Sequence, residues 1–181
     1  MLKPGSDTEI MVKFADGGAA VTCCKVGGGK VYVAGVWPGI EYTFNNRKQD
    51  SDMSRDLDPA VCKFVSAPAL EKVQPVVDTG QPCVEGFLLK NNRSGKYGVV
   101  LANWAVRLKG IVISEKSKKE DKTYAKETVP LRDLAIKVRG VGNVTKATSA
   151  WLQKDLALKK GADTVIVSLP EIEEGDVLIL E

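Results

Sequence analysis

The sequence of 181 residues contains no histidine, four cysteines and few aromatic residues. Without an imidazole, the usual general base for a serine or cysteine nucleophile is missing, which excludes histidine-dependent catalysis. Zinc sites draw on closely spaced cysteine and histidine, and the chain has no Cys-x-x-Cys pair, so we expect no metal and no cofactor. Cys23 and Cys24 would point to opposite faces of a strand. A disulfide between Cys62 and Cys83 stays open beside the alternative of buried free thiols.

Strong charge and long apolar runs are also missing. The formal net charge is only +3, whereas a nucleic-acid-binding domain is strongly basic, so we expect no nucleic-acid partner. The basic run at residues 116–126, KSKKEDKTYAK, includes two acidic residues and is predicted to be a solvated loop. No apolar stretch approaches the roughly 20 residues that span a bilayer, and the amino-terminal MLKPGSDTEIM has no apolar segment of a signal peptide. We therefore expect no membrane partner, and the compartment stays open.

The chain does offer a glycine-punctuated β pattern near its start. Turns are predicted at Asp16-Gly17-Gly18 and at the triplet Gly27–Gly29, and they separate three apolar runs, residues 10–15, 19–26 and 31–37. This order is typical of a β-meander. Lys30 after the glycines would suit a phosphate loop, but Val31 continues a strand where that loop needs a helix. Since a small sheet without a partner layer is marginally stable, we expect residues 1–44 to be the last strands of an incomplete domain in a larger protein.

Residues 45–82 are polar and then interrupted by prolines at positions 59, 68, 75 and 82. Proline removes a backbone donor and disfavours a long helix. We predict a linker of extended segments, with at most one helical turn or a short strand at 59–65.

Residues 83–181 carry short apolar segments at regular spacing with turn residues between them. In residues 134–138, apolar side chains alternate with others, which indicates a strand with one buried face. We predict a mainly β protein whose principal domain is an antiparallel β-sandwich of about eight strands. The predicted strands are residues 83–90, 97–104, 108–114, 128–139, 144–150, 151–158, 163–169 and 176–180.

Two ordered sets of residues resemble one family. In the first part these are Asp16-Gly17, Ala20-Val21, Gly29-Lys30, Val31-Tyr32-Val33, Gly35, Trp37-Pro38-Gly39 and Tyr42. They resemble the last strands of the glutamine-amidotransferase-like, β-galactosidase-trimerisation-type domain of large bacterial glycoside-hydrolase-like proteins. Those proteins often continue into a terminal β-sandwich, whose pattern is similar to Pro82, Val84-Glu85, Leu88-Leu89, Val99, Leu101, Asn103-Trp104, Ser149-Ala150, Val165, Val167, Leu169-Pro170, Asp176-Val177-Leu178 and Leu180.

The resemblance implies a carbohydrate-active parent protein without placing its active site in this chain. The family turn is more usually Gly-Lys-Gly, and residues 115–127 look like an insertion. The catalytic barrel is absent, so no catalytic residue carries over. A glycosidase needs two carboxylates flanking the scissile bond. Both groups of neighbouring carboxylates, Asp56 with Asp58 and Glu171 with Glu173 and Glu174, are interpreted as solvated loop residues.

The tryptophans remain as candidates because aromatic rings stack on sugars. Trp104 is predicted to be a core residue or an inter-domain contact, and Trp151 to be half exposed. The candidate ligand-binding residues are Trp37, Tyr42 and Trp151.

We interpret the chain as a non-catalytic carboxy-terminal accessory segment that makes domain or oligomer contacts. Its partners would be the missing parent domains or a second copy, with carbohydrate as a further possibility. The alternatives are a free-standing carbohydrate-binding β-sandwich and, behind it, a hydrolase that uses carboxylates alone.

Overall fold

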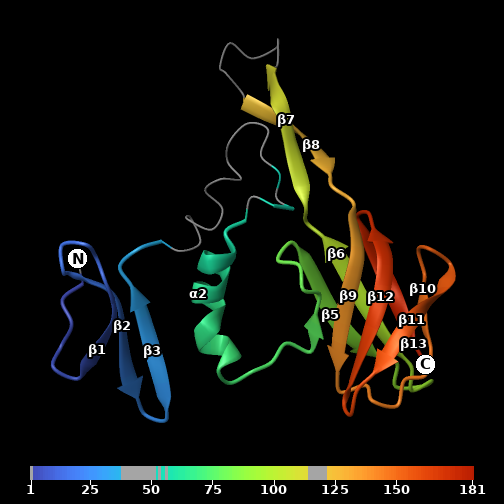
Figure 1. The fold of residues 1–181 in the computed structure, drawn as a ribbon, viewed down its shortest axis with the longest axis horizontal. Coiled ribbons are helices and arrows are strands. Elements are labelled where there is room, and N and C mark those ends of the chain that lie inside the picture. Colours follow the sequence, from blue (N-terminus) through green and yellow to red (C-terminus); the bar gives the residue numbers. More distant parts are fainter. Residues whose placement is uncertain (1, 38–51, 53, 56, 114–121) are drawn as a thin grey trace. The chain divides into compact units, whose positions relative to one another are not determined.

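The computed structural model describes residues 2–37, 52, 54–55, 57–113 and 122–181 (Figure 1). Among them it contains one helix and thirteen strands, so the chain is mainly β, as predicted. The chain divides into two compact units, Met1–Thr43 and Phe44–Glu181. Each unit is described by itself.

The first unit is a three-stranded antiparallel sheet in the order β1-β2-β3. Its strands are β1 (Thr8–Lys13), β2 (Ala19–Val26) and β3 (Gly29–Ala34). Val26 pairs with Gly29, so the glycine triplet forms a hairpin turn as predicted, and Gly27 at its first turning position has a φ of 56°. Glycine adopts this left-handed backbone without a steric penalty. The central strand β2 is buried from residue 19 to residue 23, whereas β1 and β3 are largely exposed.

The second unit begins with a helix where the sequence predicted extended segments. The helix α2 spans Pro59–Leu70, and the Asp58 carboxylate caps it by accepting hydrogen bonds from the backbone N–H groups of Ala60 (2.8 Å) and Val61 (3.2 Å). Pro59 occupies the start of the helix, where its missing N–H has no intrahelical partner to lose. Pro68 lies in the last turn, so it removes one hydrogen bond close to the end. The prediction of extended segments was wrong because proline is tolerated in the first turn of a helix and costs little near its end.

The principal sheet of the second unit has eight antiparallel strands in the order β4-β9-β12-β11-β10-β13-β6-β5. Its two outer strands, β4 and β5, also contact each other, so the sheet is nearly closed on itself. This confirms the predicted antiparallel β-sandwich fold class. The strands are β4 (Val77–Asp78), β5 (Val84–Lys90), β6 (Tyr97–Asn103), β9 (Leu131–Arg139), β10 (Ala147–Ser149), β11 (Lys154–Lys160), β12 (Thr164–Ile172) and β13 (Gly175–Leu180).

The core of this sheet follows the alternation seen in the sequence. Every second residue points inward in β6, in β13, in residues 134–138 of β9 and in residues 165–169 of β12, which is the expected consequence of the two-residue period of a strand. The largest fully buried side chains are Val99, Ile136, Val138, Val141, Val165, Val167, Leu169, Ile172, Leu178 and Leu180. Gly86 on β5 lies against Val77 on β4, and a Cβ at Gly86 would meet Val77 Cγ1 at 2.4 Å. This glycine therefore permits the close approach of the two outer strands.

A separate hairpin joins β6 to β9. It consists of β7 (Val106–Ile113) and β8 (Lys122–Thr128). The basic run 116–126 was predicted to be a loop, but residues 122–126 belong to strand β8, which corrects that prediction. The strand forms because its backbone groups pair with those of β7. The charged side chains of the run do not prevent this pairing. Residues 114–121 lie outside the described residues. The described residues include no helix that is long and apolar enough to cross a membrane.

A buried carboxylate ties the start of the second unit to this hairpin. Asp52 forms an isolated bridge with Arg107 on β7 and is almost completely buried. Its carboxylate accepts hydrogen bonds from Arg107 Nη2 (3.0 Å) and from the Ser54 backbone N–H (3.0 Å) and hydroxyl (2.5 Å). Burial raises the pKa of Asp52, but the hydrogen bonds from Ser54 and Arg107 outweigh it, so the pKa lies below its ordinary value of 3.8.

This pKa shift makes the contribution of Asp52 to stability dependent on pH. Because the folded state holds the carboxylate charged, its contribution is complete above the ordinary pKa of 3.8 and is lost as the pH falls through the lower folded value. We expect Asp52→Asn to destabilise the protein at pH 7, and the difference from wild type to shrink below about pH 4. Urea unfolding between pH 3 and pH 7 measures this. The exposed Asp163→Asn is the matched control, and a difference between wild type and Asp52→Asn that does not change with pH would contradict the assignment.

Candidate functional site

The structure places the candidate aromatic residues in different parts of the chain. Trp37 lies beyond β3 and is 74% exposed, whereas Tyr42 lies outside the described residues. Trp104 follows β6 and is 58% exposed, which rules out the predicted core position. Its backbone is fixed by a hydrogen bond from its N–H to the Cys83 carbonyl (2.8 Å). Trp151 is 62% exposed, in line with the expected half-exposed position.

Trp151 sits on a turn that a buried polar network holds in place. The Asp176 carboxylate, on β13, accepts hydrogen bonds from the Trp151 backbone N–H (3.0 Å) and from the Ser149 hydroxyl (2.5 Å). Ser149 Oγ in turn accepts from the Leu152 N–H (2.9 Å). Asp176 and Ser149 are both buried, and buried polar groups that satisfy one another rigidify their surroundings. Gln153 completes the turn with a φ of 51°.

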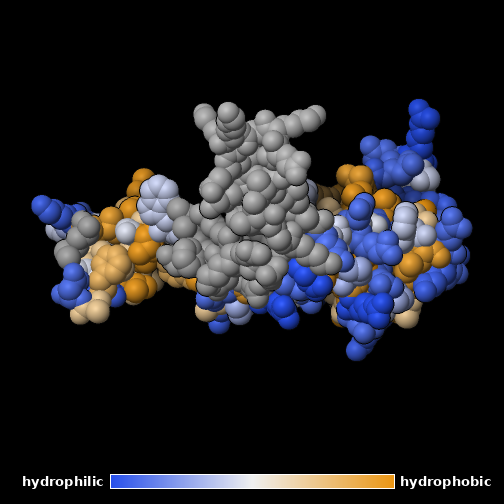
Figure 2. Space-filling model, turned by 90° about the horizontal axis from the view of Figure 1, so that it is seen from above, coloured by the Kyte–Doolittle hydropathy of each residue, from blue (hydrophilic) through white to orange (hydrophobic). Residues whose placement is uncertain are grey.

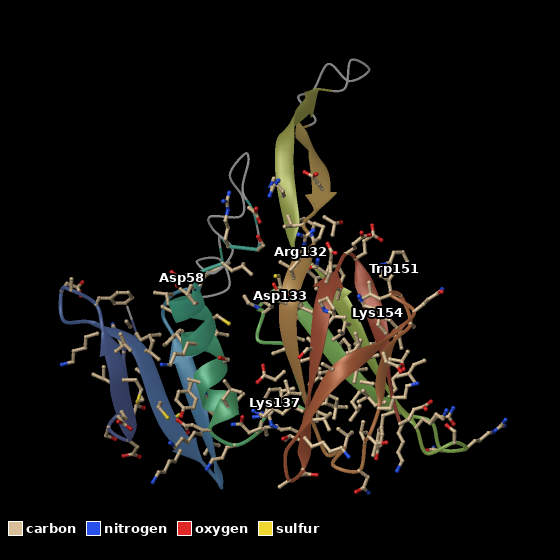
Figure 3. All side chains as sticks on the ribbon, turned by 45° about the vertical axis from the view of Figure 1, so that its right-hand side comes forward. Asp58, Arg132, Asp133, Lys137, Trp151 and Lys154 are labelled. Atoms are coloured by element: carbon tan, nitrogen blue, oxygen red, sulfur yellow. The ribbon has the colours of Figure 1, made fainter. Side chains whose placement is uncertain are left out.

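A groove of about 380 Å³ lies beside this turn. Its lining residues come from β6, from the turn after β10 and from β13: Val100, Leu101, Ala150, Trp151, Gly175, Asp176 and Val177. Val100 pairs with Val177, and Leu101 and Leu178 on either side of that pair are buried in the core. Val100 and Val177 therefore face outward, and the groove opens on the outer surface of the sheet. Figure 3 shows Trp151 at the end of the sheet that also carries Lys154.

The three-stranded sheet presents an apolar surface of a different kind. The register aligns Ile10 with Thr22 and Val33, and it aligns Cys24 with Val31. These residues share one side of the sheet, which we call the open face; its members are Thr8, Ile10, Thr22, Cys24, Val26, Val31 and Val33. Four of them are exposed large apolar side chains: Ile10, Val26, Val31 and Val33. Hydrophobic side chains gather visibly over this unit (Figure 2).

Two of the carboxylates considered for catalysis, Asp58 and Glu171, have structural partners. Asp58 caps α2, and Asp56 lies outside the described residues. Glu171 pairs with Arg132 at 3.3 Å across β12 and β9. The backbone carbonyls of Glu173 and Glu174 accept hydrogen bonds from the Asn103 side chain and backbone.

The cysteines are free thiols, so the disulfide between Cys62 and Cys83 that the sequence left open is not formed. Cys83 is buried, and burial raises the pKa of its thiol. Among the described residues, no group of three or more cysteine, aspartate or glutamate side chains could hold a metal ion.

Comparison with known proteins gives a match among the solved structures. No protein-family model matches the chain, and no curated protein matches its sequence. A solved structure, alpha-L-fucosidase isoenzyme 2 from Paenibacillus thiaminolyticus, matches over 91% of this chain with a TM-score of 0.56 and 14% identity. The fold resembles one part of a fucosidase. The chain spans 22% of the length of that fucosidase, and at this level of identity the match concerns the fold.

Phe87 is the surface residue that sequence reasoning missed. It pairs with Val100 and, like that residue, faces outward, and it is 59% exposed. The segment CVEGFLLK, residues 83–90, could have indicated an exposed apolar residue, because apolar side chains stand at both odd and even positions of this strand. Such a strand has either two covered faces or one exposed apolar face.

Proposed function

We propose that this chain is a non-catalytic accessory segment of a glycoside-hydrolase-like protein and that its open face packs against another part of that protein. The observation that carries the proposal is the open face itself. Ile10, Val26, Val31 and Val33 are exposed on one side of a three-stranded sheet, and a contiguous apolar surface of this kind marks an interaction site. A three-stranded sheet also gains stability from a covering layer.

The rest of a larger protein is the occupant that we favour for this face. The chain has the fold of a segment equal to 22% of a fucosidase, and in that enzyme the segment belongs to a longer polypeptide. The resemblance of Val31-Tyr32-Val33 and Trp37-Pro38-Gly39 to the last strands of an amidotransferase-like domain supports the same occupant. In this proposal the open face meets the preceding part of such a domain.

The open face predicts the behaviour of the isolated chain in solution. We expect size-exclusion chromatography with light scattering to show mixed oligomers whose mass rises with protein concentration, because apolar surface is left without its normal partner. Introducing Val31→Lys and Val33→Lys together should shift the population to monomer, since two buried lysines would oppose association. Val73→Lys is the matched control, because Val73 is exposed in the second unit and the substitution is chemically the same.

Two results would overturn parts of this proposal. A discrete dimer at every concentration, dissolved by the paired lysine substitutions, would assign the open face to a second copy of the chain. Turnover of aryl glycosides by the purified chain, abolished by Asp58→Asn, would contradict the non-catalytic role and revive a hydrolase that uses carboxylates alone.

A further inference from the structure

A second apolar surface lies on the outer side of the principal sheet, in the unit that does not carry the open face. Phe87, Val100 and Val177 pair in register across β5, β6 and β13. Since neighbouring strands lie about 4.8 Å apart, this row is roughly 10 Å long from Phe87 to Val177. Trp151 extends the row, because it lines the groove together with Val177. We call these four residues the aromatic row.

The aromatic row has large exposed rings at its ends and smaller side chains between them. Its ends are the exposed rings of Phe87 and Trp151, and its centre consists of two valines. The outward position two residues before each valine is a glycine, Gly98 on β6 and Gly175 on β13, whereas Ile179 and Leu89 border the row with larger apolar side chains. The groove beside Trp151 holds about 380 Å³, which falls within the range of small-ligand sites. The surface therefore suits a flat, ring-shaped ligand of modest size.

The row is also prepared for binding before any ligand arrives. The Trp151 backbone is fixed to Asp176, and the Ala150 N–H donates to the Val177 carbonyl (3.0 Å), so the turn is attached to the strand that forms the groove floor. A ligand that meets a preformed site avoids much of the entropic cost of ordering it.

The groove presents little charge to a ligand, which favours a neutral one. Among the described residues that line it, Asp176 is the sole ionisable side chain, and its carboxylate is buried and occupied by hydrogen bonds. The margin carries hydrogen-bonding groups: Thr148 pairs with the outward-facing Ile179, and its hydroxyl donates to the Asp155 carboxylate (2.9 Å), whose charge is balanced by Lys146 at 3.1 Å. Aromatic faces attract the apolar C–H faces of a ring, and polar groups at the rim suit hydroxyls.

We propose that the aromatic row binds a neutral oligosaccharide of two or three rings, which stacks on Trp151 and Phe87 and directs hydroxyls toward the Thr148–Asp155 rim. A neutral sugar combines an apolar ring face with hydroxyls at its edge, which matches the distribution of groups on this surface. This site goes beyond the proposed packing of the open face and does not depend on it, because the two surfaces lie in different units.

A glycan array of neutral, sialylated and sulfated oligosaccharides, followed by calorimetric titration of the strongest neutral trisaccharide, tests the proposal. We expect binding to neutral glycans, weakened about tenfold or more by Trp151→Ala and to a similar degree by Phe87→Ala, through loss of stacking. Trp151→Phe should keep part of the affinity. Trp104→Ala is the matched control, since Trp104 is equally exposed and lies outside the row, and it should leave affinity unchanged.

Three outcomes would overturn the inference. The first is that no neutral glycan on the array binds the protein. The second is equal affinity of wild type and Trp151→Ala for the glycan, and the third is a preference of the protein for acidic glycans. If the array is silent while Trp151→Ala alters the oligomeric state, the aromatic row is a protein-contact surface. Far-ultraviolet circular dichroism and the midpoint of urea unfolding of each variant confirm that a loss of binding does not come from a loss of fold. The failure of this proposal leaves the open-face experiment intact, because that experiment changes residues of the other unit.

Discussion

Replacing Asp176 with alanine is expected to lower the free energy of unfolding by about 3 kcal/mol, because it leaves buried donors without acceptors. The Ser149 hydroxyl and the Trp151 N–H both donate to this carboxylate, and Ser149 is fully buried. The turn that carries Trp151 should loosen as well, since its main attachment to β13 is removed.

Urea unfolding followed by far-ultraviolet circular dichroism measures this effect. Asp176→Asn keeps one oxygen that can accept from the Trp151 N–H, so its destabilisation should be clearly smaller than that of Asp176→Ala. Asp155→Ala serves as the control, because Asp155 is an exposed carboxylate on β11 that also accepts hydrogen bonds at the rim. If Asp176→Ala remains within about 1 kcal/mol of wild type, the network does not hold the turn.

Substituting alanine for Gly86 is expected to destabilise the nearly closed sheet by about 2 kcal/mol, through overpacking between β4 and β5. The added Cβ would lie 2.4 Å from Val77 Cγ1 and 3.3 Å from Leu101 Cδ2. Either the two strands move apart or Val77 leaves its position. Both responses weaken the contact that closes the sheet.

A double-mutant cycle separates this steric effect from other consequences of losing a glycine. Val77→Ala removes the clashing methyl group, so Gly86→Ala combined with Val77→Ala should be more stable than Gly86→Ala alone. Gly98→Ala is the matched control on the neighbouring strand, where an added Cβ would meet no atom within 4 Å. Additive losses in the cycle would show that Val77 is not the obstacle at Gly86.

The strands of the principal sheet could be predicted because their chemistry is local. In β9, Leu134, Ile136 and Val138 alternate with exposed or half-buried neighbours, and the register to β12 keeps this alternation. The glycine turn at residue 27 was predictable for the same reason. Turn chemistry and a period of two suffice when one face is buried and the other is not.

The helix α2 and strand β8 could not be predicted in the same way. In α2, the effect of proline depends on where the helix begins, and this is set by the Asp58 cap rather than by composition. In β8, pairing with β7 outweighs the unfavourable composition of a lysine-rich run. The two-residue strand β4 is too short to carry any pattern and exists because it pairs with β9.

The surfaces were predicted only in part. Trp151 was identified from residue type, but the hydrogen bonds that join Asp176 to the Trp151 N–H and to the Ser149 hydroxyl span 25 and 27 positions and require the β10–β13 pairing. Phe87 was overlooked because a continuously apolar segment does not reveal which of its faces is covered. The open face likewise depends on register, which aligns Ile10, Thr22 and Val33 across three strands.

The position of β13 in the sheet has a consequence for synthesis of the protein. Val100 on β6 pairs with Val177 on β13, so the two partners are made about 75 residues apart, and contacts of such long range slow folding. At ribosomal speeds the β5–β6 hairpin waits on the order of ten seconds with the outer edge of β6 unpaired. Nascent chains therefore pass through a period in which that edge can pair with another chain. The yield of folded protein would then depend on translation rate and chaperone supply as much as on the stability of the finished sheet.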